Sequence, residues 1–287
     1  NCIKYICGVH IMTKSDIINI SENLYNAHKT SVLSEETAAL LGADEFCFFD
    51  TPLIGIAAAD DQLFEKMKDA QIIGPHFITP KQWLENAKTV ISIFVPYSAA
   101  VRKANSTCPK NEIAPEYVYG KNYLVPYIDA LEEKIVSAIK EKGYSAVIPS
   151  KEGGRMKEAV MTADGTRLKY TSGWSERHAA YACGLGTLGI SGGLITAKGV
   201  AGRYLSIITD MPLKADERPY TDPYEYCTLC GACIARCPAD AITVENKKDK
   251  AKCSVFVDTT KEKFAPLYGC AKCQCGVPCA NGIPKKR

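Results

Sequence analysis

Four cysteines in the last quarter of the chain have the spacing of an iron-sulfur ligand set. They lie in the run C-x2-C-x2-C-x3-C from Cys227 to Cys237, directly before Pro238. Three thiolates spaced two residues apart bind one 4Fe-4S cluster, and in two-cluster ferredoxins the fourth cysteine ligates the other cluster. A second set of cysteines is therefore expected downstream of the run.

The second set is present, because nine of the 14 cysteines lie between residues 227 and 279. We expect Cys279 to complete the first cluster, with Cys275 as the alternative. The first cluster would then be bound by Cys227, Cys230, Cys233 and Cys279, and the second by Cys237, Cys253, Cys270 and Cys273.

Zinc and disulfides are the competing interpretations of so many cysteines. Zinc sites use two C-x2-C pairs separated by a longer spacer, whereas this run places four cysteines within eleven residues. Disulfides are disfavoured because residues 1–11 lack the cleavage site of a signal peptide. Reduced thiols indicate the cytoplasm, and no apolar run approaches the eighteen or so residues of a membrane helix.

Composition and hydrophobic patterning predict an α/β fold with two domains. The 287 residues are 46% hydrophobic with a net charge of +3, enough apolar residues for one large core and a small second domain. Apolar runs at 53–59, 89–95 and 204–209 indicate strands, and a linker at 213–223 separates an α/β core, residues 1–212, from a cluster domain, residues 213–287.

Helical periodicity between these strands indicates a crossover connection. The stretch 117–142 has apolar residues on one helical face and ends before Gly143, and a strand is expected at 144–148. A helix between two strands fits a parallel crossover. The stretch 151–165 is expected to be a loop, and 174–183 a short helix.

A glycine-rich segment and the residues before it are candidate site residues. The stretch 184–189 matches G-x-G-x-x-G, but a helix rather than a strand is expected before it, so dinucleotide binding is disfavoured. Glycines here would let the backbone lie against a planar ligand or a cluster. Trp174, Arg177 and His178 concentrate polar and aromatic groups that are typical of a cavity lining.

Taken together, these motifs resemble epoxyqueuosine reductase and its relatives. The resemblance is carried by residues 117–123, by 174–186, by the cysteine run and by 268–274. It implies a nitroreductase-like α/β core, a C-terminal ferredoxin-like domain with two 4Fe-4S clusters, and cobalamin in the core, as in reductive dehalogenases. The corrin pocket is expected to include Tyr117, Tyr119, Gly120, Trp174, Gly184, Gly186, Gly189 and Gly192.

The resemblance also implies catalytic residues and a reaction. Tyr170 matches the position of the family's proton-donating aspartate, and we expect Tyr170, Arg177 and His178 to place substrate or protons. The expected activity is cobalamin-dependent, oxygen-sensitive reduction of a small organic substrate, with electrons from a ferredoxin or flavodoxin. The alternative is an electron-transfer protein that reduces a corrinoid or flavin enzyme.

No membrane partner is expected, and tRNA is expected to be an unlikely partner. Two family positions are replaced by Asn122 and Leu124, and the sequence stops at Arg287 without the helical repeats that help relatives hold tRNA. From the residues alone, tRNA is therefore expected to be an unlikely partner.

Overall fold

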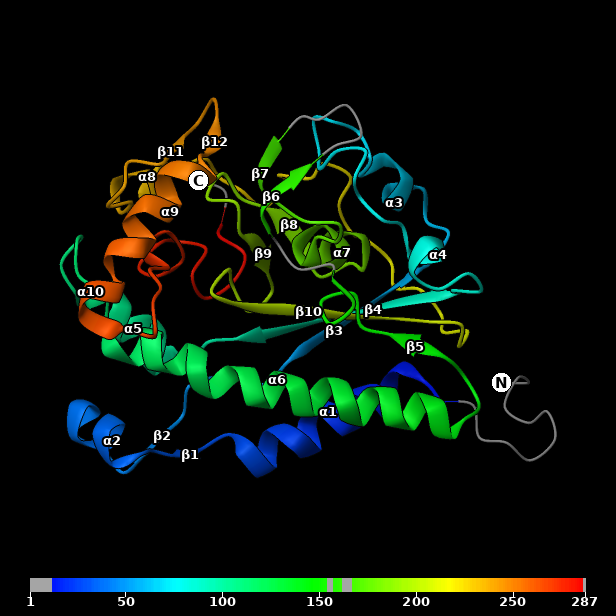
Figure 1. Cartoon of the computed structure of the whole chain (residues 1–287), viewed down its shortest axis with the longest axis horizontal. Coiled ribbons are helices and arrows are strands. Elements are labelled where there is room, and N and C mark those ends of the chain that lie inside the picture. Colours follow the sequence, from blue (N-terminus) through cyan, green and yellow to red (C-terminus); the bar gives the residue numbers. More distant parts are fainter. Residues whose placement is uncertain (1–11, 154–156, 162–166, 286–287) are drawn as a thin grey trace.

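A four-stranded antiparallel sheet forms the centre of the protein. The computed structural model describes residues 12–153, 157–161 and 167–285. The strand order is β3-β4-β10-β5, and every neighbouring pair is antiparallel (Figure 1). The strands are β3 (Leu53–Ala58), β4 (Thr89–Pro96), β10 (Gly202–Thr209) and β5 (Ala146–Val147).

The expected crossover is present, with two differences. Two helices, α5 (Ala99–Thr107) and α6 (Pro115–Glu141), connect β4 to β5. Both strands are antiparallel to β10, so they run parallel to each other. However, β10 lies between them, and α5 was not expected from the sequence.

Alternating side chains of β4 divide the core between the two faces of the sheet. Ile91, Ile93 and Val95 belong to the cluster that includes α1 (Lys14–His28) and α6, whereas Val90 packs with α7 (Glu176–Ala182). This is the period of two that a strand requires. In Figure 1, α1 and α6 run along one side of the sheet and α7 lies on the other.

The remaining elements surround this centre. Part of the stretch expected to be a loop is a strand, because residues 157–161 pair with 167–171, and the glycine-rich segment forms a hairpin. The elements are β1 (Ser31–Val32), α2 (Glu35–Leu41), β2 (Glu45–Phe46), α3 (Gln62–Lys66), α4 (Pro80–Trp83), β6 (Lys157–Met161), β7 (Arg167–Thr171), β8 (Gly186–Leu188), β9 (Leu194–Thr196), α8 (Ala232–Ala235), β11 (Ile242–Thr243), β12 (Lys247–Lys248), α9 (Lys250–Thr259), α10 (Lys261–Phe264) and the 3-10 helix Lys272–Gln274.

The cysteine-rich end packs directly against the rest of the chain. One buried cluster joins Ile190, Ile195 and Val200 to Cys233 and Cys237. Residues on both sides of position 212 therefore share a core, and the domain boundary there stays a prediction. None of the described helices is both long and apolar enough to span a membrane.

Candidate functional site

A loop with two left-handed residues gathers three cysteines around a first cavity. Leu229 and Gly231 have φ of 52° and 72°, and α8 begins directly after Gly231. Such turns let a short loop bend around one point. The cavity is lined by Cys227, Cys230, Cys233 and Cys279, with Gly189 and Pro278 among its other residues.

The second cavity is lined by cysteines from three separate segments. Cys237 follows α8, Cys253 lies on α9, and Cys270 and Cys273 flank the left-handed residue Ala271, whose φ is 51°. The volume of this cavity is about 300 Å³. The fourth cysteine of the run thus lines a different cavity from the first three.

Cys275 lines neither cavity. Its side chain is fully buried in the core that also contains Phe264, and burial raises its pKa to about 11. Of the two late cysteines considered for the first cluster, only Cys279 lies beside Cys227, Cys230 and Cys233.

The cavity thiols are poor ligands unless a metal deprotonates them. Burial raises the pKa of Cys233 to about 11, and those of Cys270 and Cys279 to about 12. A coordinated metal stabilises the thiolate and reverses this preference. Among the described residues, no three His, Cys, Asp or Glu side chains converge closely enough to bind a single metal ion. The cysteines of a cubane are spaced more widely than that, because each binds a different one of the four irons.

Basic side chains line the second cavity together with the cysteines. Lys121, Arg177, Arg203 and Lys248 line it, and no carboxylate lines it in the described part of the chain. Burial, followed by the neighbouring charges of Arg203 and Lys261, lowers the pKa of Lys121 to about 8. This lining favours a negatively charged occupant.

The three expected catalytic residues have different positions. Arg177 lines the second cavity, and the residue is exposed to solvent. His178 is not part of the cavity lining; its Nδ1 lies 2.7 Å from Ser175 Oγ, and burial, then Arg177, lowers its pKa to about 4. The imidazole is therefore neutral at pH 7. The backbone of Tyr170 lies in β7, and its side chain is outside the described residues.

Most of the expected corrin-pocket residues are not brought together around either cavity. Tyr117 lines the second cavity and Gly189 the first. Trp174 stacks on Phe64 and Phe77, with ring centroids 5.9 and 5.5 Å away, on the far side of the sheet from α6.

The other expected pocket residues have local packing roles. Gly120 faces the Phe48 ring, where a Cβ would lie 2.9 Å from Cδ1. Gly186 lets β8 approach the backbone of β9, and Gly184 lies against a backbone carbonyl of the 213–223 segment. Tyr119 is partly exposed on α6, and Gly192 lies beside Lys248.

Glu176 is a functional candidate that is not among the catalytic residues expected from the sequence. Both carboxylate oxygens are buried, and burial raises the pKa of Glu176 to about 7, although the nearby Ser206 and Trp174 side chains oppose this rise. It lies beside the bond that Trp174 Nε1 donates to Ser206 Oγ over 2.7 Å. In the sequence, the signal for this candidate was an acidic residue placed between Trp174 and Arg177.

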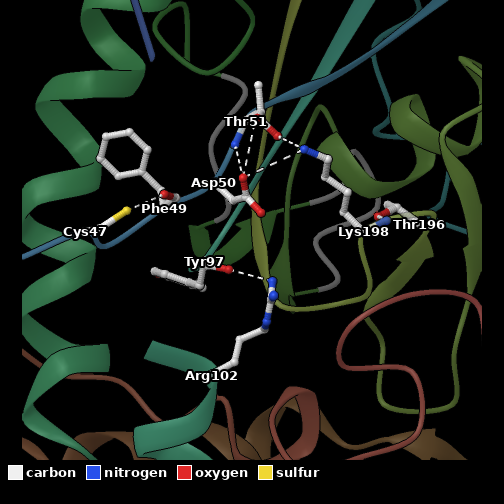
Figure 2. A network of polar contacts seen from close by, with 8 residues as sticks. All are labelled: Cys47, Phe49, Asp50, Thr51, Tyr97, Arg102, Thr196 and Lys198. Carbon is white, nitrogen blue, oxygen red and sulfur yellow. Dashed lines mark hydrogen bonds and ion pairs between the residues drawn. The ribbon is translucent and has the colours of Figure 1, made fainter. Parts of the chain in front are cut away.

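A polar network anchors the loop behind the first cavity. Lys198 Nζ donates to Thr51 O over 2.8 Å and lies 4.0 Å from Asp50 Oδ1, as Figure 2 shows. The next residues contact the cysteine segment, since Val200 N donates to Cys279 O over 3.0 Å. The segments that lead into β3 and β10 thereby hold the last cysteine of the first cavity in place.

Comparison with known proteins supports the iron-sulfur interpretation. Residues 221–243 match the family described as a 4Fe-4S binding domain. Epoxyqueuosine reductase of Cyclobacterium marinum is 25% identical over 209 residues, which cover 69% of this chain and 60% of that protein. The resemblance to epoxyqueuosine reductase is confirmed. Its counterpart in Staphylococcus aureus is 31% identical over 119 residues, 38% of this chain and 30% of that protein.

Solved structures confirm the mixed α/β fold. Epoxyqueuosine reductase with a tRNA-Tyr epoxyqueuosine-modified tRNA stem loop superposes with a TM-score of 0.50 at 18% identity, covering 94% of this chain and 67% of that one. The reductive dehalogenase NpRdhA with 3-bromo-4-hydroxybenzoic acid also gives 0.50, at 15% identity, covering 94% and 37%.

These findings correct one expectation about partners. The chain spans about 60% of the length of the first curated relatives that it matches. Those relatives are named epoxyqueuosine reductase, and a structure of this fold holds a tRNA stem loop. The expectation that tRNA is an unlikely partner is therefore wrong: missing helical repeats in the sequence at hand were weak grounds for it.

Proposed function

We propose that this protein is an iron-sulfur reductase with two 4Fe-4S clusters and that its substrate is epoxyqueuosine-modified tRNA. The observation that carries the proposal is the division of eight cysteines between two cavities, four in each. The ligands would be Cys227, Cys230, Cys233 and Cys279 for the first cluster, and Cys237, Cys253, Cys270 and Cys273 for the second.

The exposure of the cavity cysteines supports a direction for electron flow. Cys230, which lines the first cavity, is exposed, whereas the four cysteines of the second cavity are buried or half-buried. After burial, the neighbouring Cys273 also raises the pKa of Cys233, which is consistent with closely spaced cavities. Electrons from an external one-electron donor would enter at the first cluster and pass to the second.

The electron count of the proposed reaction matches two clusters. Reducing an epoxide to an alkene consumes two electrons and two protons and releases the oxygen as water. Each cluster stores one electron, so a fully reduced chain holds the two that one turnover needs. The cationic lining of the second cavity is compatible with a phosphate-bearing substrate.

The size of the second cavity bears on cobalamin, the cofactor that the resemblance implies. The second cavity encloses about 300 Å³ and must also hold a cluster. Pockets of about 300–1,000 Å³ suit drug-sized ligands, and cobalamin is larger than these. The described residues therefore fit a cluster but do not enclose a whole cobalamin.

The decisive experiment is anaerobic purification followed by iron analysis and turnover. We expect about eight irons per chain and oxidation of the dithionite-reduced protein by epoxyqueuosine-modified tRNA, but not by unmodified tRNA. Cys273→Ser should lose one cluster, whereas Cys108→Ser, which changes a cysteine outside both cavities, should lose none. Four irons in the wild type would contradict two clusters, and eight irons without reoxidation would contradict the substrate.

A further inference from the structure

Lys248 lies between the two segments that supply late cysteines to the second cavity. It ends β12 and is followed by Asp249, whose side chain caps α9. That helix carries Cys253, so the position of Lys248 is tied to one of the cysteines by only a few residues. In Figure 1 β12 lies beside α8 and α9.

The ammonium group of Lys248 contacts a cysteine sulfur from the other segment. Its Nζ donates to Cys273 Sγ over 3.9 Å, a reasonable distance for a bond to a large sulfur atom. Lys248 also lines the second cavity, together with Cys253 and Cys273. Its charge is therefore directed at the sulfur side of the cavity.

The stem of Lys248 is held in place by the glycine-rich hairpin. A Cβ at Gly192 would lie 3.4 Å from Lys248 Cδ and 3.6 Å from its Cβ. The absence of a side chain at Gly192 leaves room for the lysine stem between the hairpin and the cavity. This contact gives Gly192 a role in packing the lysine.

Lys248 differs from the other basic residues of the cavity in what it contacts. Lys121 Nζ lies over the ring of Tyr268, 3.7 Å from its centroid. Arg177 and Arg203 also line the cavity, but in the described part of the chain Lys248 is the one cation that hydrogen-bonds to a cysteine sulfur. The effect of Lys248 on the electrostatics of a cluster in this cavity should therefore exceed that of the other basic residues that line it.

We propose that Lys248 is a positioning residue that raises the reduction potential of the second cluster. This inference rests on the proposed function, because it requires a cluster in the second cavity. Reduction adds one electron to a cluster whose thiolate ligands already make it negative. A positive charge and a hydrogen bond at a ligand sulfur stabilise the reduced form more than the oxidised form. Electrons are thereby drawn from the first cluster towards the second.

The test is an anaerobic redox titration of the holoprotein followed by electron paramagnetic resonance. Lys248→Gln and Lys248→Met should lower the midpoint potential of the second cluster and leave the first unchanged. The expected shift is roughly tenfold in the reduction equilibrium, about 59 mV for one electron. Lys248→Arg should stay near the wild type. Lys252→Gln is the control, since it removes an exposed charge next to Cys253.

Each outcome separates this inference from the proposed function. A wild type with only four irons would overturn the second cluster itself. Two clusters in Lys248→Gln with an unchanged potential would overturn the role of Lys248, as would an equal shift in Lys248→Arg, which would indicate shape rather than charge. Loss of the second cluster from both neutral variants, with retention in Lys248→Arg, would replace a role in potential with one in assembly.

Discussion

Asn105 Nδ2 donates a hydrogen bond to the carbonyl oxygen of Cys270 over 2.8 Å, which ties helix α5 to the loop that lines the second cavity. Asn105 is fully buried, and its Oδ1 accepts from Ala114 N over 3.2 Å. Its own carbonyl accepts from Lys272 Nζ over 2.9 Å. One side chain and one carbonyl thus join the core to the cysteine segment.

Replacing Asn105 with alanine should weaken the second site selectively. The change leaves buried groups of Cys270 and Ala114 without partners, which costs about 1–3 kcal/mol for each group. We expect faster loss of about four irons on exposure to a chelator, because one cubane holds four. Iron and sulfide analysis over time measures this. Ser106→Ala, at the next position of α5, is the control, and equal iron loss from both variants would contradict a specific role for Asn105.

Two serine variants test which late cysteine serves the first cluster. Cys279→Ser should lower the iron content by about four per chain, the content of one cubane. Cys275→Ser should retain all the iron, because Cys275 lines neither cavity. Iron analysis and electron paramagnetic resonance of the reduced proteins distinguish the two. Iron loss from Cys275→Ser alone would reverse the assignment.

Gly199 lets two backbone segments meet behind the first cavity. Its φ is 89°, and a Cβ at this position would collide with the carbonyl oxygen of Ala280. Gly199→Ala should therefore destabilise the segment around Cys279 and release iron from the first cluster. Gly143 is the matched control, since its φ is 81° but nothing lies within 4 Å of the added Cβ.

The comparison of these two alanine variants isolates the collision from backbone strain. A left-handed conformation costs a non-glycine residue roughly 1–2 kcal/mol, and both variants carry that cost. Iron retention and urea midpoints should be lower for Gly199→Ala than for Gly143→Ala. Equal values would show that the approach to Ala280 relaxes without consequence.

The buried carboxyl of Glu176 predicts a pH dependence of stability. Its pKa rises from 4.5 to about 7 on folding, so between these values the folded protein binds more protons than the unfolded chain. The contribution of Glu176 to stability is therefore fully present below pH 4.5 and is lost as the pH rises to about 7. Glu176→Gln, which mimics the protonated side chain, should remove this decrease.

His178 has the opposite effect on the pH dependence of stability. Variants are therefore needed to separate its contribution from that of Glu176. Its pKa falls from 6.5 to about 4 on folding, so the unfolded chain binds more protons between these values and stability rises with pH. Anaerobic urea midpoints from pH 4.5 to 7.5 should thus rise more steeply for Glu176→Gln than for wild type. Glu133→Gln removes an exposed carboxylate and is the control. Parallel curves for all three proteins would contradict the buried acid.

The sequence alone determined the chemistry of the cysteine segment and the type of most main elements. Local spacing sets how three thiolates meet one cluster, so the 227–237 run indicated a 4Fe-4S site without further context. The apolar face of 117–142 likewise predicted α6, because helical periodicity is a property of consecutive residues. The resemblance to epoxyqueuosine reductase came from the same short motifs.

Only the tertiary structure decided which distant residues face each other. Lys248 and Cys273 are 25 residues apart, and their contact depends on how β12 and the last loop pack. Cys279 lies beside the first three cysteines while Cys275 is buried in the core, although the two are only four positions apart. Glycines 120, 184 and 186 pack against side chains and backbone of the protein itself. Residue type signals the need for space, but the neighbour that fills that space is set by the fold.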